Sequence, residues 1–155
     1  MRLVYSPQPD LKGFIERNIA RCSGRGLPQP GMAIGVINAD SELIGGFYYH
    51  DYDPDAGVIE ISGASLDKKW LTKATLYGLF AYPFHDLHCQ LVAMRHSAKD
   101  IALARMLKAY GFQQATIPRL FGRGEDAIIS TLTLEDWEGN AFTRSYLQRI
   151  GADIG

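Results

Sequence analysis

The chain has 155 residues, of which 46% are hydrophobic and 21% are charged, and its formal net charge is −1. This composition is ordinary for a folded protein, and we expect residues 1–155 to form a single domain. The near-zero charge argues against a dedicated nucleic-acid binder, whose phosphate contacts need a basic excess. No apolar run approaches transmembrane length and the first residues lack a signal-peptide core, which predicts no membrane partner and a cytoplasmic location.

The first part of the chain predicts a short strand, a helix and a meander of strands. Met1–Tyr5 alternates weakly between apolar and polar residues, which favours a short strand. Asp10 is placed to cap a helix over Leu11–Cys22, whose apolar residues recur at helical spacing. Apolar and aromatic runs joined by polar turns then predict three antiparallel strands. These strands are Met32–Asn38, Leu43–Tyr52 and Val58–Leu66.

The second part predicts a crossover and a terminal hairpin. A helix over Thr72–Pro83 ends at its proline, and the continuous hydrophobicity of Leu87–Met94 is typical of a strand covered on both faces. Because a helix separates Val58–Leu66 from Leu87–Met94, these strands are predicted to be parallel neighbours. The remaining elements are a helix at Ala98–Tyr110, strands at Gln113–Phe121 and Ala127–Leu134, and a helix at Glu135–Arg149.

The predicted order is β-α-β-β-β-α-β-α-β-β, which indicates an α/β protein with a twisted, mixed sheet flanked by helices. The apolar faces of the two central helices are expected to pack on this sheet. The residues predicted to be buried there are Leu76, Phe80, Leu103, Leu107 and Phe112.

Four short motifs occur in a fixed order along the chain. They are Ile59-Glu60-Ile61, the aromatic run Phe80–Phe84, the run Arg105–Phe112 ending in Gly-Phe, and the acidic-Trp group Glu135-Asp136-Trp137. Together with the element order, they resemble the Gcn5-related N-acetyltransferase (GNAT) superfamily over about Leu11 to Trp137. The resemblance is closest to the branch that acetylates ribosomal-protein N-termini and small amines. It implies a GNAT-like sheet, two splayed parallel strands, acetyl-CoA as co-substrate, and direct transfer of the acetyl group to a primary amine.

In that family the pantetheine arm of acetyl-CoA lies between the two parallel strands, and the pyrophosphate lies on the following turn. The turn has the pattern Gln/Arg-x-x-Gly-x-Gly/Ala, from which this chain departs at Asp67, Trp70 and Thr72. Glycines allow backbone amides to approach phosphate, and Trp70 does not. Asp67 repels a diphosphate, whereas Lys68 and Lys69 attract it. The cofactor contacts implied by the resemblance are Ser65, Leu66, Lys68, Lys69, Trp70, Leu71, Thr72 and Asp100, the last standing where the family often has Asn.

Acetyl transfer also needs a base for the proton of the amine and a proton donor for the leaving thiolate. Glu60 lies on the strand beside the expected cleft and is the candidate base. A strand carboxylate that faces solvent or pairs with an arginine is an equal alternative. Leu107 stands where many relatives have an acidic tyrosine, so Tyr110 or a water is the candidate donor.

Three residues are candidates to contact the acceptor: Tyr48, His50 and Arg119. For each there is an ordinary alternative, because strand tyrosines usually pack, strand histidines are usually exposed, and hairpin arginines are usually solvated. The other histidines lack metal-ligand spacing with Cys, Asp or Glu, so no metal site is predicted.

Two functions remain open. The first is an acyl-CoA-dependent N-acetyltransferase acting on a small-molecule or peptide amine. The second is a GNAT-fold binding or assembly module that has lost acetyl-CoA binding, which the altered turn favours. The acceptor and the oligomeric state, including a homodimer, are not determined by the sequence, and calorimetry with acetyl-CoA and CoA separates the two functions.

Overall fold

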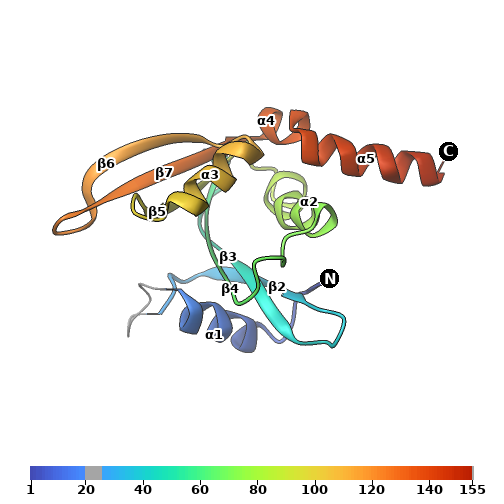
Figure 1. Ribbon diagram of the computed structural model, residues 1–155, viewed down its shortest axis with the longest axis horizontal. Helices are drawn as coiled ribbons and strands as arrows, with labels where there is room; N and C mark the ends of the chain where they lie inside the picture. Colours follow the sequence, from blue (N-terminus) through green and yellow to red (C-terminus); the bar gives the residue numbers. More distant parts are fainter. Residues whose placement is uncertain (20–25, 155) are drawn as a thin grey trace.

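The computed structural model describes residues 1–19 and 26–154 and shows a seven-stranded sheet in the order β1-β2-β3-β4-β5-β7-β6 (Figure 1). All neighbouring strands are antiparallel except β4 and β5, which are parallel. The predicted element order and the mixed sheet are therefore confirmed. The strands are β1 Arg2–Val4, β2 Gly31–Ile37, β3 Leu43–Asp53, β4 Val58–Ser65, β5 Leu91–Ser97, β6 Gln113–Gly122 and β7 Glu125–Thr133.

The parallel strands β4 and β5 pair over a short stretch and then separate. Their described pairs join Val58 to Leu91, Ile59 to Val92 and Glu60 to Ala93. Beyond these pairs, β4 continues along β3 and β5 continues along β7. The predicted parallel, splayed pair is confirmed, and a wedge opens between the two halves of the sheet.

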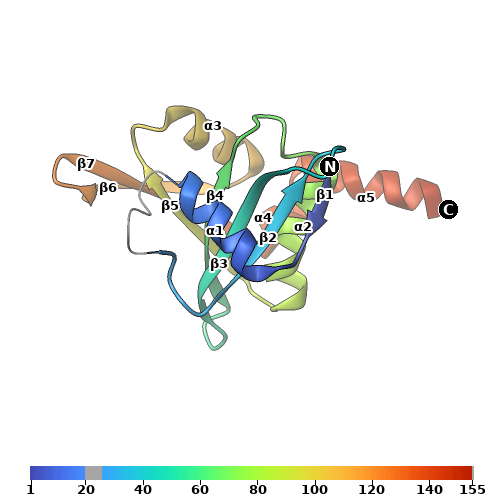
Figure 2. The ribbon, with the colours of Figure 1, turned by 90° about the horizontal axis from the view of Figure 1, so that it is seen from below.

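Helices lie on both faces of the sheet (Figure 2). The helices are α1 Gln8–Asn18, α2 Lys73–Ala81, the π-helical turn η1 Tyr82–Asp86, α3 Ile101–Tyr110, α4 Leu134–Gly139 and α5 Ala141–Ile154. Helix α1 begins after Pro7 and has no side-chain cap, so the expectation that Asp10 caps it is wrong, and Asp10 lies in the first turn. The helix ends at Asn18, and the final residues of the longer predicted helix, 20–22, lie outside the described residues.

The predicted helix end at Pro83 is also wrong, because the chain continues into η1. Pro83 has no N–H to donate to the carbonyl of Leu79, four residues earlier. That carbonyl instead accepts the hydroxyl of Tyr49 from β3, at 2.5 Å. The wider turn is closed by the amide of Leu87, which donates to Tyr82. Strand β5 consequently begins at Leu91, four residues after its predicted start at Leu87.

The single C-terminal helix expected over Glu135–Arg149 is two helices. The break lies at Asn140, whose backbone is extended. Its side-chain oxygen accepts the amide of Thr143 at 2.7 Å, and its side-chain nitrogen donates to the carbonyl of Tyr110 at 2.9 Å. This residue caps α5 and ties it to the end of α3, from which α5 projects away from the sheet (Figure 1).

The hydrophobic core consists of two clusters, one on each face of the sheet. The larger lies under α2 and α3, and the smaller lies under α1. Of the five residues predicted to be buried in the core, Phe80, Leu107 and Phe112 are buried, while Leu76 and Leu103 are partly buried against the same cluster. Among the described residues, no helix combines the length and apolar character needed to cross a membrane.

Candidate functional site

The apex of the wedge between β4 and β5 holds Glu60, the last β4 residue that pairs with β5. Strand alternation directs its side chain away from Ile59 and Ile61, which are buried in the larger cluster. The carboxylate is about one-quarter exposed and lies 3.9 Å from Nε of Arg95, on β5. Glu60 therefore has an acidic group at the point where the two halves of the sheet part.

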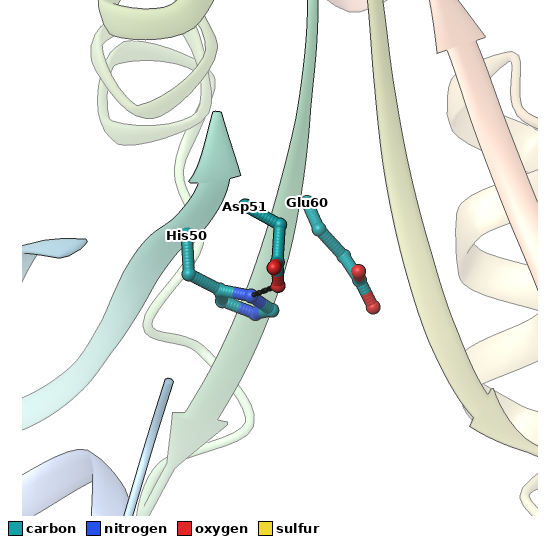
Figure 3. A group of neighbouring side chains, drawn as sticks. All are labelled: His50, Asp51 and Glu60. Atoms are coloured by element: carbon teal, nitrogen blue, oxygen red, sulfur yellow. Dashed lines mark hydrogen bonds and ion pairs between the residues drawn. The ribbon is translucent and has the colours of Figure 1, made fainter. Parts of the chain in front are cut away.

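A bulge in β3 brings a second carboxylate to the same face. His50 is paired with Glu60, and the register shifts between His50 and Asp53. Regular alternation would place Asp51 on the opposite face from His50. Asp51 instead has a left-handed φ of 54°, and its Oδ2 lies 2.5 Å from His50 Nδ1 (Figure 3). Aspartate tolerates this backbone conformation better than most residues.

The second ring nitrogen of His50 contacts β4. Its Nε2 lies 2.9 Å from Oγ of Ser62, which is partly exposed. A carboxylate only accepts hydrogen bonds, so Nδ1–H donates to Asp51, and in the neutral form of the ring Nε2 accepts a hydrogen bond from the hydroxyl of Ser62. The ring is 4% exposed and stacks on Tyr48 at 5.8 Å. Asp51, His50 and Ser62 thus form a continuous hydrogen-bonded line.

The same neighbourhood contains the donor atoms of a conceivable cation site. Ligand atoms of His50, Asp51 and Glu60 lie within 4.8 Å of one another. Sequence spacing did not predict this grouping, because it depends on pairing between β3 and β4. Both ring nitrogens of His50 are already hydrogen-bonded, so a metal ion would have to displace Asp51 or Ser62. The arrangement is better suited to moving a proton than to holding a metal, and the absence of a metal site remains a prediction.

The turn from Asp67 to Thr72 is bonded internally. Oδ1 of Asp67 accepts the amide of Lys69 at 2.8 Å, and its carbonyl accepts the amide of Trp70 at 3.2 Å. The Asp67 carboxylate therefore accepts a hydrogen bond from an amide of its own turn, at the position where a phosphate is expected to bind. The amides most suited to a ligand are those of Lys73 and Ala74, in the first turn of α2.

Thr72 begins α2 with a reciprocal cap. Its hydroxyl accepts the amide of Thr75 at 3.1 Å, and the hydroxyl of Thr75 accepts the amide of Thr72 at 2.8 Å. Lys68 and Lys69 are exposed beside this cap, as are Ser65 and Leu66. These residues can contact a ligand that lies along the end of β4.

The side chain of Trp70 belongs to the core, so only the backbone of this residue is placed to meet a cofactor. It is 8% exposed, and its ring lies edge-on to Phe47 with centroids 5.6 Å apart. A Cβ atom at Gly45 would overlap the indole. Leu71 is partly buried against the same cluster. At both positions the backbone is the part best placed to meet a ligand.

Tyr110 is buried in the core. Its hydroxyl accepts the indole N–H of Trp137 at 3.2 Å, and its ring stacks on Phe80. Burial raises the pKa of Tyr110. A proton donor to a thiolate in the wedge must reach it, so this placement does not favour the sequence-based assignment of Tyr110.

The remaining candidate residues divide between the wedge and other regions. Tyr48 is buried beside His50, and its hydroxyl donates to Pro28 at 2.7 Å. Asp100 caps α3 by accepting the amide of Leu103 at 3.2 Å. Arg119 lies in the outer part of the β6–β7 hairpin, where its amide donates to Asp126, and the structure does not bring it to Glu60.

A pocket of about 380 Å³ lies beside His50 and Asp51, at the end of β3. Tyr82, Leu87 and Met32 form part of its apolar wall. A second hollow, beside Tyr48, includes Lys12 and Glu16 of α1. His50 lines the first pocket and Tyr48 lines the second.

No family model matches this sequence, and no curated protein matches it in sequence. Solved structures match the fold. A mutant of the spermidine N-acetyltransferase SpeG from Vibrio cholerae matches with a TM-score of 0.74, over 90% of this chain and 98% of its own, at 12% identity. An Acinetobacter baylyi protein assigned as an acetyltransferase matches with a TM-score of 0.67, over 86% and 93% of the two chains, at 18% identity.

The chain has the N-acetyltransferase fold. At these identities the likeness is one of fold, and it agrees with the resemblance to the GNAT superfamily drawn from the sequence. In this chain Glu60 lies at the apex of the wedge between β4 and β5. What the site does chemically depends on the side chains described above.

Proposed function

We propose that this chain is an acyl-CoA-dependent N-acetyltransferase that transfers an acetyl group directly to a primary amine. The observation that carries the proposal is the divergence of β4 and β5 immediately beyond Glu60, in a chain with the acetyltransferase fold. Backbone groups along the diverging edges need hydrogen-bond partners, and the amides of an extended pantetheine arm supply them. The thioester carbonyl then lies near Glu60.

In this proposal Glu60 accepts a proton from the bound substrate ammonium, either directly or through a water, and the neutral amine that results attacks the thioester. Its contact with Arg95 is long, at 3.9 Å, which leaves the carboxylate able to accept a second partner. Tyr110 is turned into the core, so a water protonates the leaving thiolate. The carboxylates of Glu60 and Asp51 favour a cationic amine as acceptor, and SpeG is named as a spermidine N-acetyltransferase.

The second candidate function is a module that has lost acetyl-CoA binding. It is favoured by Asp67, whose carboxylate and carbonyl bind two amides of the turn. A diphosphate at this turn would meet that carboxylate, and the attraction of Lys68 and Lys69 would have to offset the repulsion. We expect weaker CoA binding than is usual for the fold.

Calorimetry with acetyl-CoA and with CoA separates the two functions. Micromolar binding supports the enzyme, whereas the absence of heat at millimolar concentrations supports the module. Replacing Lys68 and Lys69 together by Ala is expected to weaken CoA binding and to flatten its dependence on salt. An unchanged affinity would place the phosphates elsewhere.

Glu60→Gln tests the proposed base. We expect it to lower the turnover rate roughly 10²–10⁴-fold and to leave the affinity for acetyl-CoA unchanged. Glu42→Gln, at an exposed position in the turn between β2 and β3, is the matched control and is expected to keep full turnover. Full activity of Glu60→Gln would show that water accepts the proton and that Glu60 is a surface carboxylate.

A further inference from the structure

We infer that Asp51, His50 and Ser62 form a nucleophilic triad, and that the Ser62 hydroxyl accepts acyl groups from activated esters and thioesters. The chain then hydrolyses such acyl donors when no amine is present, which is an activity separate from direct transfer. For acyl-CoA this inference rests on the proposed function, because the thioester must enter the wedge. For small activated esters it rests on the triad alone.

The contacts occur in the order that the chemistry requires. Asp51 Oδ2 meets His50 Nδ1 at 2.5 Å, and His50 Nε2 meets Ser62 Oγ at 2.9 Å. Asp51 accepts the hydrogen bond of Nδ1–H, which fixes the tautomer whose Nε2 can take a proton from Ser62. The stacking of His50 on Tyr48 restrains the ring between its two partners.

The base and the nucleophile of the triad differ in their exposure to solvent. His50 is 4% exposed and so is shielded from bulk water, whereas Ser62 is partly exposed. Ser62 lies on the same face of β4 as Glu60, two positions beyond the last pair with β5. A hydroxyl at this position is accessible from the wedge while its base remains covered.

The wedge also supplies donors for a developing oxyanion. Beyond Glu60, β4 pairs with β3 along one edge, and its other edge faces the gap. In an extended strand every second residue sends its amide to the same side, so amides beside Ser62 point into the gap. Backbone amides directed at a developing negative charge are the usual means of stabilising the tetrahedral intermediate.

The reaction proceeds in two balanced steps. Ser62 Oγ forms a bond to the acyl carbon while His50 Nε2 takes the hydroxyl proton. The bond from the acyl carbon to the leaving sulfur or oxygen then breaks, and the leaving group takes that proton from His50. Water attacks the Ser62 ester with His50 as base, which releases the carboxylic acid and restores the hydroxyl. Asp51 keeps its hydrogen bond to Nδ1 throughout and stabilises the imidazolium.

The probes are p-nitrophenyl acetate and a fluorophosphonate, incubated with the full chain and followed by intact mass and peptide mapping. We expect one acetyl or phosphonyl group on Ser62, and steady release of p-nitrophenol. Ser62→Ala is expected to lose the label and to lower the rate of release at least about 10²-fold. Ser130→Ala is the matched control, because Ser130 also contacts a histidine but is fully buried, and it is expected to keep label and rate.

Two further measurements keep the outcome decisive. Ser62→Cys is expected to take the acetyl group as a thioester that neutral hydroxylamine removes, whereas the Ser62 ester resists it. Far-ultraviolet circular dichroism of Ser62→Ala checks that the variant is folded. Labelling that persists in folded Ser62→Ala, a label that maps elsewhere, no label with either probe, or hydrolysis abolished by EDTA would each overturn the triad.

The same experiments distinguish this inference from the proposed function. If acetyl-CoA gives no heat but p-nitrophenyl acetate labels Ser62, the transferase proposal fails and the triad stands. If Glu60→Gln lowers amine acetylation while Ser62→Ala leaves both acetylation and ester hydrolysis unchanged, the transferase stands and the triad fails.

Discussion

Two histidine–serine pairs lie on opposite faces of the same sheet. His50 contacts Ser62 at 2.9 Å on the face of α1, and His96 contacts Ser130 at 2.7 Å beneath α3. Both rings are almost fully buried, at 4% and 6% exposed. Their surroundings differ. His50 has the carboxylate of Asp51 on its second nitrogen, whereas His96 Nδ1 has no hydrogen-bond partner among the described residues.

The serines differ as well. Ser62 is partly exposed beside the wedge, whereas Ser130 is fully buried and also receives a hydrogen bond from Gln114. Burial lowers the pKa of His96, which favours the neutral form of the ring. The same two side chains therefore serve structure on one face and are poised for chemistry on the other. The third group and the access of solvent decide which role the pair takes.

Removing the Asp51 carboxylate should make the His50–Ser62 pair resemble the His96–Ser130 pair. Asp51→Asn keeps a residue that tolerates the left-handed φ of 54°. It removes the charge that fixes the His50 tautomer, so we expect acylation of Ser62 to slow roughly 10²–10⁴-fold. The rate of p-nitrophenol release measures this.

Because the side chain of Asp51 is 61% exposed, we expect the unfolding free energy of Asp51→Asn to stay within about 1 kcal/mol of the parent. An equal loss of rate and of stability would indicate that Asp51 supports the fold instead of His50. An unchanged rate would remove Asp51 from the triad.

Weakening the packing of α3 over the His96–Ser130 pair should change the stability of the fold and leave the activity of Ser62 unchanged. The side chain of Gln114 donates to Ser130 and to the carbonyl of Ala104 in α3. Leu107, on the same helix, is buried in the larger hydrophobic cluster. Leu107→Ala is expected to lower the unfolding free energy by about 2–5 kcal/mol in urea titrations, and to leave Ser62 acylation per folded molecule unchanged. Met106→Ala, on the same helix but 46% exposed, should cost less than about 0.5 kcal/mol. A similar small cost at Leu107 would show that this helix face is not packed.

The smallest expected effect concerns pH. The pKa of folded His96 lies below its ordinary value, so the unfolded chain binds this proton first as the pH falls. This histidine therefore lowers stability as the pH drops through the ordinary histidine range towards its folded pKa. His96→Gln should reduce the loss of unfolding free energy between about pH 7 and pH 5, measured by urea titration at both values. An unaltered pH dependence would show that other groups cause the loss.

The sequence predicted the element order and the parallel pair because both follow from local patterns, whereas the splay of that pair was implied by the resemblance to the GNAT superfamily. Hydrophobic periodicity identified the strands, and the helix between β4 and β5 required a parallel crossover. The π-helical turn was not predictable in the same way. It depends on the Tyr49 hydroxyl, which donates to the Leu79 carbonyl that Pro83 leaves without a backbone donor. Tyr49 and Pro83 belong to different elements, so no local pattern predicts the contact.

In the candidate site, too, residues set by a local pattern were predicted, and residues set by strand pairing were not. Glu60 was identified from its strand and its neighbours, and the structure places it at the apex of the wedge. Asp51 and Ser62 were missed. Alternation predicts that Asp51 faces away from His50, and a single left-handed residue in a bulge reverses that. Ser62 becomes notable only when the register of β3 and β4 places it beside the imidazole.

The fit of Trp70 against Gly45 has a consequence for how such chains can change through evolution. The indole occupies the space that any side chain at position 45 would need. A lineage must therefore have glycine at position 45 before it can accept tryptophan at position 70, and it cannot replace that glycine while the tryptophan remains. The two positions should vary together among descendants, and a relative with a small residue at position 70 is free to carry a larger one on β3.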